Sequence, residues 1–432
     1  MGNRVALHNL GCKVNAYEIE AMQQLLEEAG YEIVPFEPGA DIYVINTCTV
    51  TNIADRKSRQ MLHKAKKMNP EAIVVATGCY VQTGGDKLEK DEAIDLVLGN
   101  NQKINIVEAL AEYAENKPGH GSHVIKINQT KEYEELSIDR TAEHVRAYIK
   151  VQDGCNQFCT YCIIPYARGR VRSRSMEDVT EEVRTLAENG YKEVVLTGIH
   201  LSSYGIDFDK ERHLLDLIRA VHQIEGIERI RLGSLEPGII TEEFAEAISK
   251  LPKMCPHFHL SLQSGCNATL KRMNRRYTSE EYAERCGILR KYFENPALTT
   301  DVIVGFPGET EEEFEASRNF VDSIDFYETH IFKYSRREGT KAAVMPDQVS
   351  EGKKSARSAE MIEMGEQKRR AYEESFIGKE VEVLVEEEIE RNGEIFWTGH
   401  TKEYIKIALQ SRENLRNCIV KVQIEDALQI IH

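Results

Sequence analysis

No stretch of this 432-residue sequence approaches the roughly 18 to 20 consecutive apolar residues that a membrane-spanning helix needs. Residues 1–20 also lack the continuous apolar segment of a signal peptide, because Arg4 and Lys13 interrupt them. We therefore expect a cytoplasmic protein without a membrane partner. Basic residues are in deficit: 55 Lys and Arg stand against 71 Asp and Glu, a formal net charge of −16. This balance excludes a protein that coats nucleic acid over its whole surface, so any polyanionic partner must meet a local basic patch.

Low-complexity tracts are absent as well. The composition, with 41% hydrophobic and 29% charged residues, is typical of a folded globular chain, and the length predicts about three domains. Ten cysteines are present. In a reducing compartment cysteines are more often metal ligands, catalytic groups or small buried side chains than disulfides, so their positions in the fold decide their role.

The first part of the chain, residues 1–115, repeats a short apolar strand, a turn and an amphipathic helix three times. Strands are predicted at 4–10, 41–46 and 72–77. The pattern is typical of βαβ units, whose crossovers place the strands in a parallel sheet. Cys12, Cys48 and Cys79 each follow one of these strands. Because the carboxyl ends of parallel strands share one edge, the three thiols can converge on one point.

A polar segment at 116–143 is interpreted as a linker, and a second alternating region follows over 144–374. Its predicted strands are 145–151, 193–197, 229–234, 257–262, 298–304 and 327–334. Helical patterns begin near Ser175, Leu214, Thr241, Thr278 and Glu309. Six β/α repeats are too few for a closed eight-stranded barrel, so we predict an open partial (β/α)6 barrel with its site at the carboxyl ends of the strands.

The remaining sequence changes character twice. Residues 350–375 lack proline and predict one long helix that leaves the barrel. In residues 375–432, apolar and charged residues alternate at 381–385, 395–397, 404–409 and 419–424, and Asn392-Gly393 predicts a hairpin turn. The predicted fold class is therefore α/β, with an N-terminal parallel-sheet domain, a central partial barrel and a small C-terminal antiparallel β-barrel.

Three more cysteines, Cys155, Cys159 and Cys162, directly follow the first barrel strand at spacings of four and three. Iron–sulfur clusters take cysteine thiolates as ligands, and three thiolates so close together suit one face of a cubane cluster, whose fourth iron then lacks a protein ligand. A tetrahedral zinc site is the alternative. It would need a fourth ligand, and none stands at the usual local spacing, although His144 or His200 can approach through space.

This cysteine loop at the head of a β/α barrel resembles the radical S-adenosylmethionine (SAM) superfamily, in which the open iron of a 4Fe-4S cluster binds SAM. With a second group of three cysteines upstream, the whole chain resembles the methylthiotransferases. That family combines an N-terminal domain holding an auxiliary 4Fe-4S cluster, a radical SAM barrel and a C-terminal TRAM domain. The resemblance implies two 4Fe-4S clusters, an auxiliary one on Cys12, Cys48 and Cys79 and a catalytic, SAM-binding one on Cys155, Cys159 and Cys162.

Further stretches at the ends of barrel strands are similar to the family's SAM-binding motifs, namely 196–198, 234–237, 261–265 and 300–309. The resemblance implies SAM contacts from Tyr161, Gly198, Glu236, Gln263 and Asp301. Each stretch is equally well interpreted as a turn or a helix cap, and Tyr161 as a packed core residue.

Arginines follow the barrel cysteines closely, at Arg168, Arg170, Arg172 and Arg174. Alternate spacing in an extended segment would place them on one face, able to grip RNA phosphates. The segments 56–59 and 271–276 are also basic, and for these a solvated face is as good an interpretation as RNA contact. The tail 375–432 is acidic, with seven Lys and Arg against eleven Asp and Glu, which is unusual for an RNA-binding module.

Residues 11–15, 46–52 and 162–174 most resemble the methylthiotransferases that act on N6-threonylcarbamoyladenosine in tRNA. The implied reaction replaces the C2 hydrogen of this nucleoside, next to the anticodon, with a methylthio group. SAM would serve both as methyl donor and as source of a 5′-deoxyadenosyl radical, with electrons from a donor such as a flavodoxin or ferredoxin.

Two alternatives keep the chemistry but change the substrate to isopentenyladenosine tRNA or to an aspartate of a ribosomal protein. The acidic tail favours the ribosomal protein. A third, from another class, is a non-catalytic iron–sulfur redox protein bound to RNA.

Overall fold

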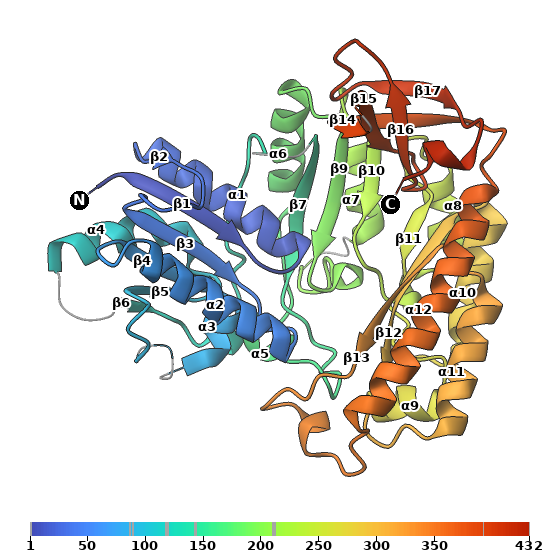
Figure 1. Cartoon of the computed structure of the whole chain (residues 1–432), viewed down its shortest axis with the longest axis horizontal. Helices are drawn as coiled ribbons and strands as arrows, with labels where there is room; N and C mark the ends of the chain where they lie inside the picture. The colour runs from blue at the N-terminus through green and yellow to red at the C-terminus, as the bar shows by residue number, and fades with distance from the viewer. Residues whose placement is uncertain are drawn as a thin grey trace.

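The computed structural model describes residues 2–85, 88, 90–116, 121–141, 145–209, 213–391 and 393–431. Three parts follow one another along the chain: a parallel sheet, a curved β/α barrel and an antiparallel sheet next to one end of the barrel (Figure 1). The predicted α/β fold class is confirmed. None of the described helices is both long and apolar enough to cross a membrane.

The N-terminal sheet contains six parallel strands in the order β2-β1-β3-β4-β5-β6. They are β1 (Arg4–Asn9), β2 (Glu32–Ile33), β3 (Ile42–Thr47), β4 (Ile73–Gly78), β5 (Leu96–Leu98) and β6 (Gly121–His123). The three predicted strands correspond to β1, β3 and β4. The other three have only two or three residues each, too few for an apolar alternation to be visible, and β6 lies inside the segment predicted as a linker.

Helices cover both faces of this sheet, as the βαβ pattern requires. Buried side chains of α1 (Lys13–Glu28) and α4 (Ile106–Asn116) pack on one face. Those of α2 (Asn52–Met68) and α3 (Cys79–Gly84) pack on the other. The strands therefore all point their carboxyl ends toward the same edge, where Figure 1 shows the barrel domain beginning.

The barrel is open, as predicted, and has six parallel strands. They are β7 (Arg146–Asp153), β9 (Glu193–Gly198), β10 (Arg229–Leu232), β11 (His257–His259), β12 (Ala297–Val304) and β13 (Glu328–Lys333). A short antiparallel strand, β8 (Arg172–Ser173), pairs with β7 at the free edge. Between β10 and β11 the pairing is reduced to two isolated bridges, Ile230 with Met254 and Leu235 with Leu260.

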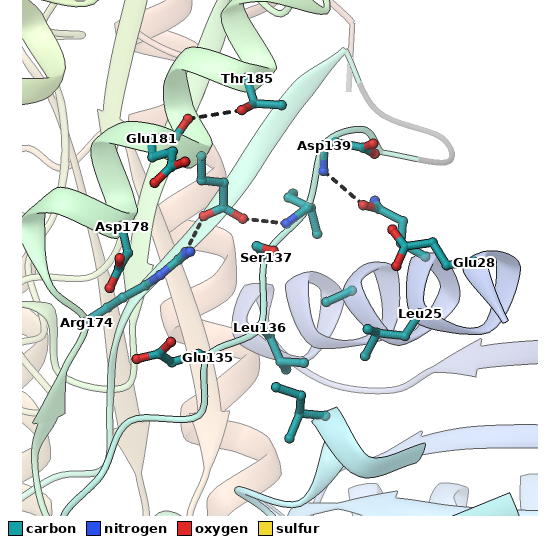
Figure 2. A pocket seen from close by; sticks show the side chains of 15 residues that line it. Leu25, Glu28, Glu135, Leu136, Ser137, Asp139, Arg174, Asp178, Glu181 and Thr185 are labelled. Atoms are coloured by element: carbon teal, nitrogen blue, oxygen red, sulfur yellow. Dashed lines mark hydrogen bonds and ion pairs between the residues drawn. The ribbon is translucent and has the colours of Figure 1, made fainter. Parts of the chain in front are cut away.

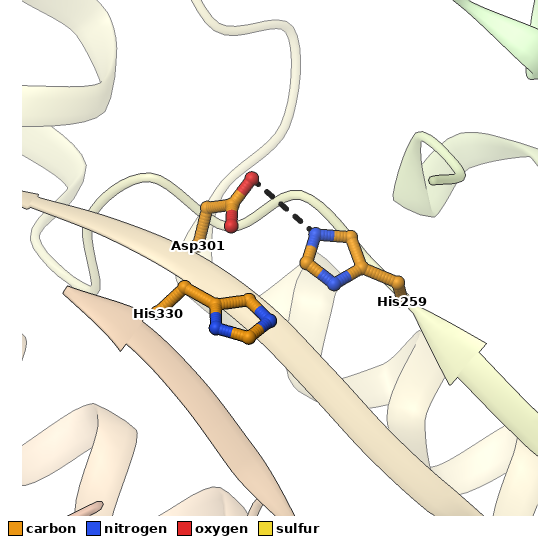
Figure 3. A group of neighbouring side chains, drawn as sticks. All are labelled: His259, Asp301 and His330. Atoms are coloured by element: carbon orange, nitrogen blue, oxygen red, sulfur yellow. Dashed lines mark ion pairs between the residues drawn. The ribbon is translucent and has the colours of Figure 1, made fainter. Parts of the chain in front are cut away.

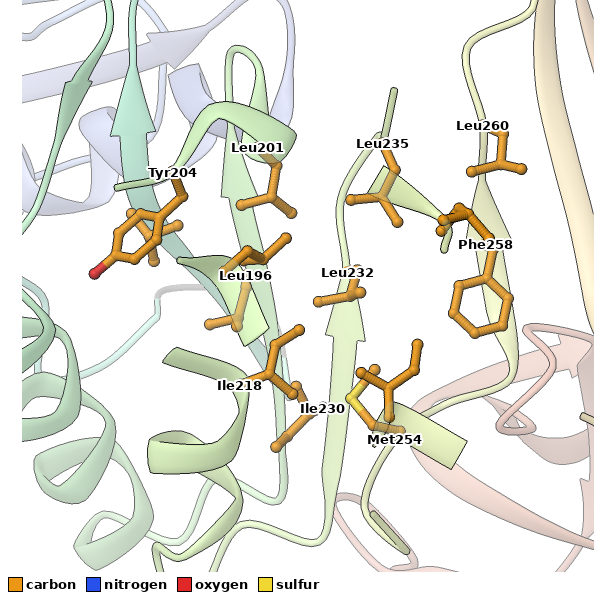
Figure 4. Packing of buried hydrophobic residues seen from close by; sticks show 14 of the residues in the cluster. Leu196, Leu201, Tyr204, Ile218, Ile230, Leu232, Leu235, Met254, Phe258 and Leu260 are labelled. Carbon is orange, nitrogen blue, oxygen red and sulfur yellow. The ribbon is translucent and has the colours of Figure 1, made fainter. Parts of the chain in front are cut away.

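The outer face of the barrel is covered by α6 (Met176–Glu188), α7 (Leu214–His222), α8 (Glu242–Ser249), α10 (Ser279–Tyr292) and α11 (Glu311–Ile324). Ser175, Thr241, Thr278 and Thr310 cap four of these helices by accepting a hydrogen bond from a backbone N–H three residues further on. Buried apolar side chains such as Leu196, Ile218 and Ile230 fill the space between strands and helices (Figure 4). The predicted helix starts match these caps to within a residue or two.

The chain leaves the barrel through α12 (Glu351–Glu374), which packs against β13. The C-terminal sheet consists of β14 (Glu380–Arg391), β15 (Glu394–His400), β16 (Lys406–Gln410) and β17 (Ile419–Gln423), in the order β16-β15-β14-β17. The predicted antiparallel strands are confirmed, but among the described residues β16 and β17 do not pair, so this sheet does not close into a barrel. Asn392 of the predicted hairpin turn lies outside the described residues.

The C-terminal sheet docks on the amino ends of the barrel strands, opposite the end where the site is expected. Arg229, the first residue of β10, donates hydrogen bonds to the backbone oxygens of His400 and Glu382, both at 2.8 Å. Tyr404 contacts the guanidinium groups of Arg146 and Arg231, whose Cζ atoms lie 4.9 and 4.8 Å from its ring centroid. Its φ is +77°, an uncommon conformation that this docking holds in place.

Candidate functional site

The first three cysteines lie together at the carboxyl edge of the N-terminal sheet. Cys12 directly precedes α1, Cys48 directly follows β3, and Cys79 is the first residue of α3. At Gly11, whose φ is +116°, an added Cβ would stand 3.3 Å from the Sγ of Cys48. Burial raises the pKa of the Cys48 thiol to about 11, with the thiols of Cys79 and Cys12 contributing. The three thiols therefore share one electrostatic environment.

The second three cysteines lie in the loop between β7 and α5 (Ile164–Arg168). The loop turns at Gly154, where φ is +72° and an added Cβ would stand 1.9 Å from the backbone oxygen of Arg170, so only glycine fits. Burial raises the pKa values of Cys155 and Cys162 to about 11 and 12, and in both cases the thiol of Cys159 contributes. Buried thiols of this kind become thiolates when they bind a metal, because the cation compensates their charge.

Spacing favours a cluster over a single metal ion at both cysteine groups. Around a tetrahedral zinc, with Zn–S bonds of about 2.3 Å, the sulfur atoms would lie about 3.8 Å apart. Among the described residues, the one group of three His, Cys, Asp or Glu ligand atoms that all lie within 4.8 Å of each other is His259, Asp301 and His330. Neither cysteine group is that tight. Of the two histidines considered for zinc, His144 lies outside the described residues, and His200 contacts Glu236 instead, at 3.1 Å.

Arg168, predicted to contact RNA, is fully buried beside the N-terminal cysteines. Its Nε donates to the Sγ of Cys79 at 3.1 Å, and its Nη1 donates to Oε1 of Glu18 at 2.5 Å. Its Nη2 donates to Oδ1 of Asn15 at 2.7 Å. An arginine of the barrel domain, at the end of the helix that follows the barrel cysteines, thus reaches into the N-terminal domain and contacts one of its cysteines. The prediction of an exposed phosphate contact is wrong for Arg168, because α5 turns this side chain inward.

Arg168 belongs to a buried cluster of charged side chains, which consists of the cations Lys103, Lys150, Arg168 and Arg172 and the carboxylates Glu18 and Asp153. Four cations against two carboxylates leave a surplus of two positive charges, and all six side chains are at most 2% exposed. Nε of Arg172 has no hydrogen-bond partner among the described residues. A cluster held by three thiolates is anionic, so its charge would offset this surplus at Cys79. The residues present therefore fit such a group.

The other predicted RNA contacts divide in the same way. Arg172 and Arg174 are buried, and only Arg170 is exposed. Arg174 pairs with Glu182 and donates to the hydroxyl of Tyr17 at 3.2 Å. It lines a cavity of about 370 Å³ between α1 and α6 whose other charged side chains are carboxylates (Figure 2). Because both side chains are buried, and carboxylates around Arg174 would repel a phosphate, the predicted arginine face is wrong for Arg172 and Arg174 as well.

Arg275 connects the barrel cysteines to Glu236, a predicted SAM contact. The sequence does not single out this arginine on its own. Nη1 of Arg275 lies 3.2 Å from the Sγ of Cys159, and its Nη2 lies 2.9 Å from Oε1 of Glu236. Burial opposes the charge of Glu236, but His200 and Arg275 outweigh it and lower the pKa of this carboxyl. The sequence predicts an RNA patch or a solvated face for segment 271–276, yet the side chain of Arg275 is only 6% exposed.

Of the remaining predicted SAM contacts, Tyr161, Gly198 and Gln263 lie at or beyond the carboxyl ends of barrel strands, and Asp301 lies within β12. Gly198 ends β9, and an added Cβ there would stand 2.8 Å from Oε1 of Gln152. Gln263, with φ of +70°, donates its backbone N–H to the backbone oxygen of Asp301 at 2.8 Å. Tyr161 packs edge-on against Phe306, with ring centroids 6.4 Å apart.

Asp301 faces two histidines from the neighbouring strands (Figure 3). Its Oδ2 lies 3.3 Å from Nε2 of His259, and the ring of His259 stacks on that of His330 with centroids 5.8 Å apart. Thr299, two residues earlier in β12, lies 3.0 Å from Nδ1 of His259. Alternate residues of β11, β12 and β13 therefore line the inner wall of the open barrel with polar, hydrogen-bonding groups.

Two family profiles match the chain. The profile of the Radical SAM superfamily matches residues 149–321, and the one described as Uncharacterized protein family UPF0004 matches residues 4–99. These segments contain the barrel cysteines and the N-terminal cysteines, respectively.

Curated relatives match the chain over nearly its whole length. The Threonylcarbamoyladenosine tRNA methylthiotransferase MtaB of Bacillus subtilis (strain 168) is 43% identical, over 97% of this chain and 93% of the relative. The protein of the same name from Aquifex aeolicus (strain VF5) is 44% identical, over 89% of this chain and 93% of the relative. The tRNA-2-methylthio-N(6)-dimethylallyladenosine synthase of Finegoldia magna (strain ATCC 29328) is 35% identical, over 96% and 90%.

Among solved structures, the radical S-adenosylmethionine methyltransferase TsrM of Kitasatospora setae has the same fold. Its TM-score is 0.59 at 18% identity, and the match covers 80% of this chain and 77% of that chain. At this identity the likeness establishes the arrangement of parallel-sheet domain and barrel and nothing about substrate.

Proposed function

This chain belongs to the radical SAM tRNA methylthiotransferase family, and we propose that it converts N6-threonylcarbamoyladenosine next to the tRNA anticodon into its 2-methylthio derivative. Methylthiotransferases of this family use SAM and two 4Fe-4S clusters. One observation carries the proposal: two groups of three cysteines lie beyond strand carboxyl ends in two adjoining domains, and Arg168 of the barrel domain contacts Cys79 of the N-terminal domain. The choice of nucleoside is supported by the relatives of 43% and 44% identity, both named for threonylcarbamoyladenosine.

The cysteines divide the work in this proposal. Cys12, Cys48 and Cys79 hold the auxiliary cluster, and Cys155, Cys159 and Cys162 hold the cluster that binds SAM. When bound there, SAM and the clusters supply a 5′-deoxyadenosyl radical, a methyl group and a sulfur atom. All ten cysteines are free, so no disulfide competes for the six ligands.

The protein's own side chains orient these groups and balance their charge. Arg275 places a positive charge 3.2 Å from the sulfur of Cys159 and fixes the carboxylate of Glu236, which suits the amino group of SAM. In this proposal, Gln263 beyond β11 and Asp301 on the inner wall contribute polar contacts to SAM. On the other side, Arg168 and the surplus of buried cations compensate the negative charge of the auxiliary cluster.

Residues 1–115 act as the auxiliary-cluster domain in this proposal, 144–374 as the radical SAM core and 375–432 as the TRAM domain. Residues 116–143 connect the first two. The reaction needs electrons, which we assign to a protein donor of the flavodoxin or ferredoxin class. The substrate places the enzyme in the cytoplasm, where tRNA is modified.

Paired cysteine variants test the division of work. After anaerobic reconstitution, Cys159→Ala is expected to abolish cleavage of SAM to 5′-deoxyadenosine, because three thiolates leave no spare ligand. Cys79→Ala is expected to retain SAM cleavage while stopping methylthio transfer to tRNA. Cys286→Ala, a buried cysteine outside both groups, is the matched control and keeps both activities. If Cys79→Ala still transferred the methylthio group, the proposed role of the N-terminal cysteines in transfer would be wrong.

A further inference from the structure

Helix α2 is the most basic element on the surface of an otherwise acidic chain. It contains six lysines and arginines and one acidic residue, in a protein of net charge −16. We propose that the exposed side of α2 binds the phosphate backbone of the tRNA and holds the RNA against the N-terminal domain. This inference rests on the proposed tRNA substrate and adds the surface that meets it.

The basic side of α2 faces solvent and is free to bind. Ser58, Leu62 and Ala65 form its buried side. The exposed cations are Arg56, Lys57, Arg59, Lys64 and Lys67. Among the described residues, none of these five side chains has an ion-pair or hydrogen-bond partner. The two remaining charged side chains of the helix already form ion pairs. Asp55 pairs with Arg337 at 2.7 Å, and Lys66 pairs with Asp95 at 2.9 Å.

The spacing of these cations suits a continuous polyanion. Four of the cations lie along the same side of the helix, because successive members are three, five and three residues apart. They are Arg56, Arg59, Lys64 and Lys67. At about 1.5 Å per residue, the stretch from Arg56 to Lys67 spans about 16 Å. A row of unpaired cations of this length attracts several successive phosphates, and each contact releases counterions.

The start of α2 is fixed at the mouth of the barrel, close to the cysteine sites. The helix begins four residues after Cys48, with Thr51 as its cap. The backbone N–H of Asn52 donates to Oγ of Ser335 at 3.1 Å, and Arg337 donates to Oγ1 of Thr49 at 2.7 Å. RNA lying along α2 therefore runs toward the site. Val50 and Ile53 stand 52% and 55% exposed in this turn, where an unstacked base would meet apolar surface.

Within the described part of residues 375–431, the C-terminal sheet offers no comparable surface. Its lysines Lys402, Lys406 and Lys421 each pair with a glutamate, at 3.4, 3.0 and 3.5 Å. The segment 375–432 carries seven basic and eleven acidic residues. Figure 1 shows α2 in the N-terminal domain, away from this sheet and separated from it by barrel strands. Charge complementarity with RNA therefore favours α2 over the C-terminal domain as the main phosphate contact.

The test measures the salt dependence of tRNA binding by full-length protein with its clusters reconstituted. One variant carries Arg56→Gln, Arg59→Gln, Lys64→Gln and Lys67→Gln. The matched control removes four charges from the C-terminal domain, by Lys379→Gln, Lys406→Gln, Arg412→Gln and Lys421→Gln. A third variant exchanges lysine and arginine at the four α2 positions and so keeps the charge. Iron content and melting temperature verify that each variant is folded.

Neutralising four phosphate contacts is expected to reduce the slope of log K against log salt concentration by about 3, and to weaken binding on the order of 100-fold at low salt. The C-terminal variant and the charge-preserving variant are expected to keep the wild-type slope. An unchanged slope in the α2 variant, or an equal loss in the C-terminal variant, would overturn the inference. If the wild-type protein itself did not bind tRNA, the proposed function would fail first, and that result is distinct from a failure of α2 alone.

Discussion

Replacing Glu18 by Gln probes the buried charge cluster at Cys79 most sharply. Glu18 contacts three cations, Arg168 at 2.5 Å, Lys150 at 2.8 Å and Lys103 at 3.2 Å. Without it, Asp153 is the one carboxylate left in the cluster of four buried cations, and it contacts three of them. The matched substitution, Arg168→Gln, shifts the balance the other way and leaves three cations with two carboxylates. Each variant removes one charge from the same cluster. Glu18→Gln leaves a surplus of three positive charges, whereas Arg168→Gln leaves a surplus of one.

Removing one partner of a buried ion pair costs about 3 to 5 kcal/mol, because the other charge stays buried without compensation. Glu18→Gln belongs at the upper end of this range, since it leaves Lys103 without a carboxylate partner and leaves Lys150 and Arg168 with Asp153 alone. Arg168→Gln belongs at the lower end, because Glu18 keeps both lysines. In metal-free protein we therefore expect Glu18→Gln to lower the free energy of unfolding by about 2 kcal/mol more than Arg168→Gln.

Equilibrium urea unfolding of the anaerobic, metal-free protein measures this difference, with far-UV circular dichroism as the probe. The single tryptophan, Trp397, lies in the C-terminal sheet, so its fluorescence follows that sheet separately. Reconstitution of the clusters is expected to narrow the difference, because an anionic cluster compensates part of the surplus. If Arg168→Gln destabilised the metal-free protein as much as Glu18→Gln, the surplus of positive charge at Cys79 would be refuted.

Two further predictions concern other parts of the fold. Tyr404→Ala removes two cation–π contacts and the ring stacking on His257 and His400. The loss of about 3 kcal/mol of contact free energy is expected to weaken the docking of the C-terminal sheet on the barrel. Faster limited proteolysis near residue 378 tests it, and an unchanged rate would contradict it. Burial raises the pKa of Glu373 to about 7, so this carboxyl favours folding less as pH rises from about 4.5 through 7. Glu373→Gln is expected to stabilise the protein by about 2 kcal/mol at pH 8 and not at pH 4, as thermal melts at both values will show.

Local sequence patterns predict most of the strands and helix starts. The strands that became β1, β3 and β4, and all six barrel strands, have enough apolar residues to show their period, and the caps Ser175, Thr241 and Thr278 mark helix starts. Strands β2, β5 and β6 have two or three residues and exist only because a neighbouring strand pairs with them. No local pattern marks such strands.

The sequence predicts the parts of the site whose residues are close together along the chain. It does not predict contacts between residues that only folding brings together. The loop from Cys155 to Cys162 is visible as spacing, whereas Arg168 looked like one member of an exposed basic run and is instead buried against Cys79. A signal was present in Lys150, a lysine inside an otherwise apolar strand that requires a buried carboxylate partner. Its partner Glu18 lies 132 residues away, so no sequence pattern links the two.

The central claim is tested most directly by mass spectrometry of nucleosides after the reconstituted protein, SAM, a reductant and sulfide are incubated with tRNA. Two tRNA samples are compared, one carrying threonylcarbamoyladenosine and one carrying isopentenyladenosine. The account predicts a mass gain equal to CH3S replacing one hydrogen on threonylcarbamoyladenosine, accompanied by 5′-deoxyadenosine. A gain on isopentenyladenosine alone, or 5′-deoxyadenosine without any methylthio product on either nucleoside, would contradict it.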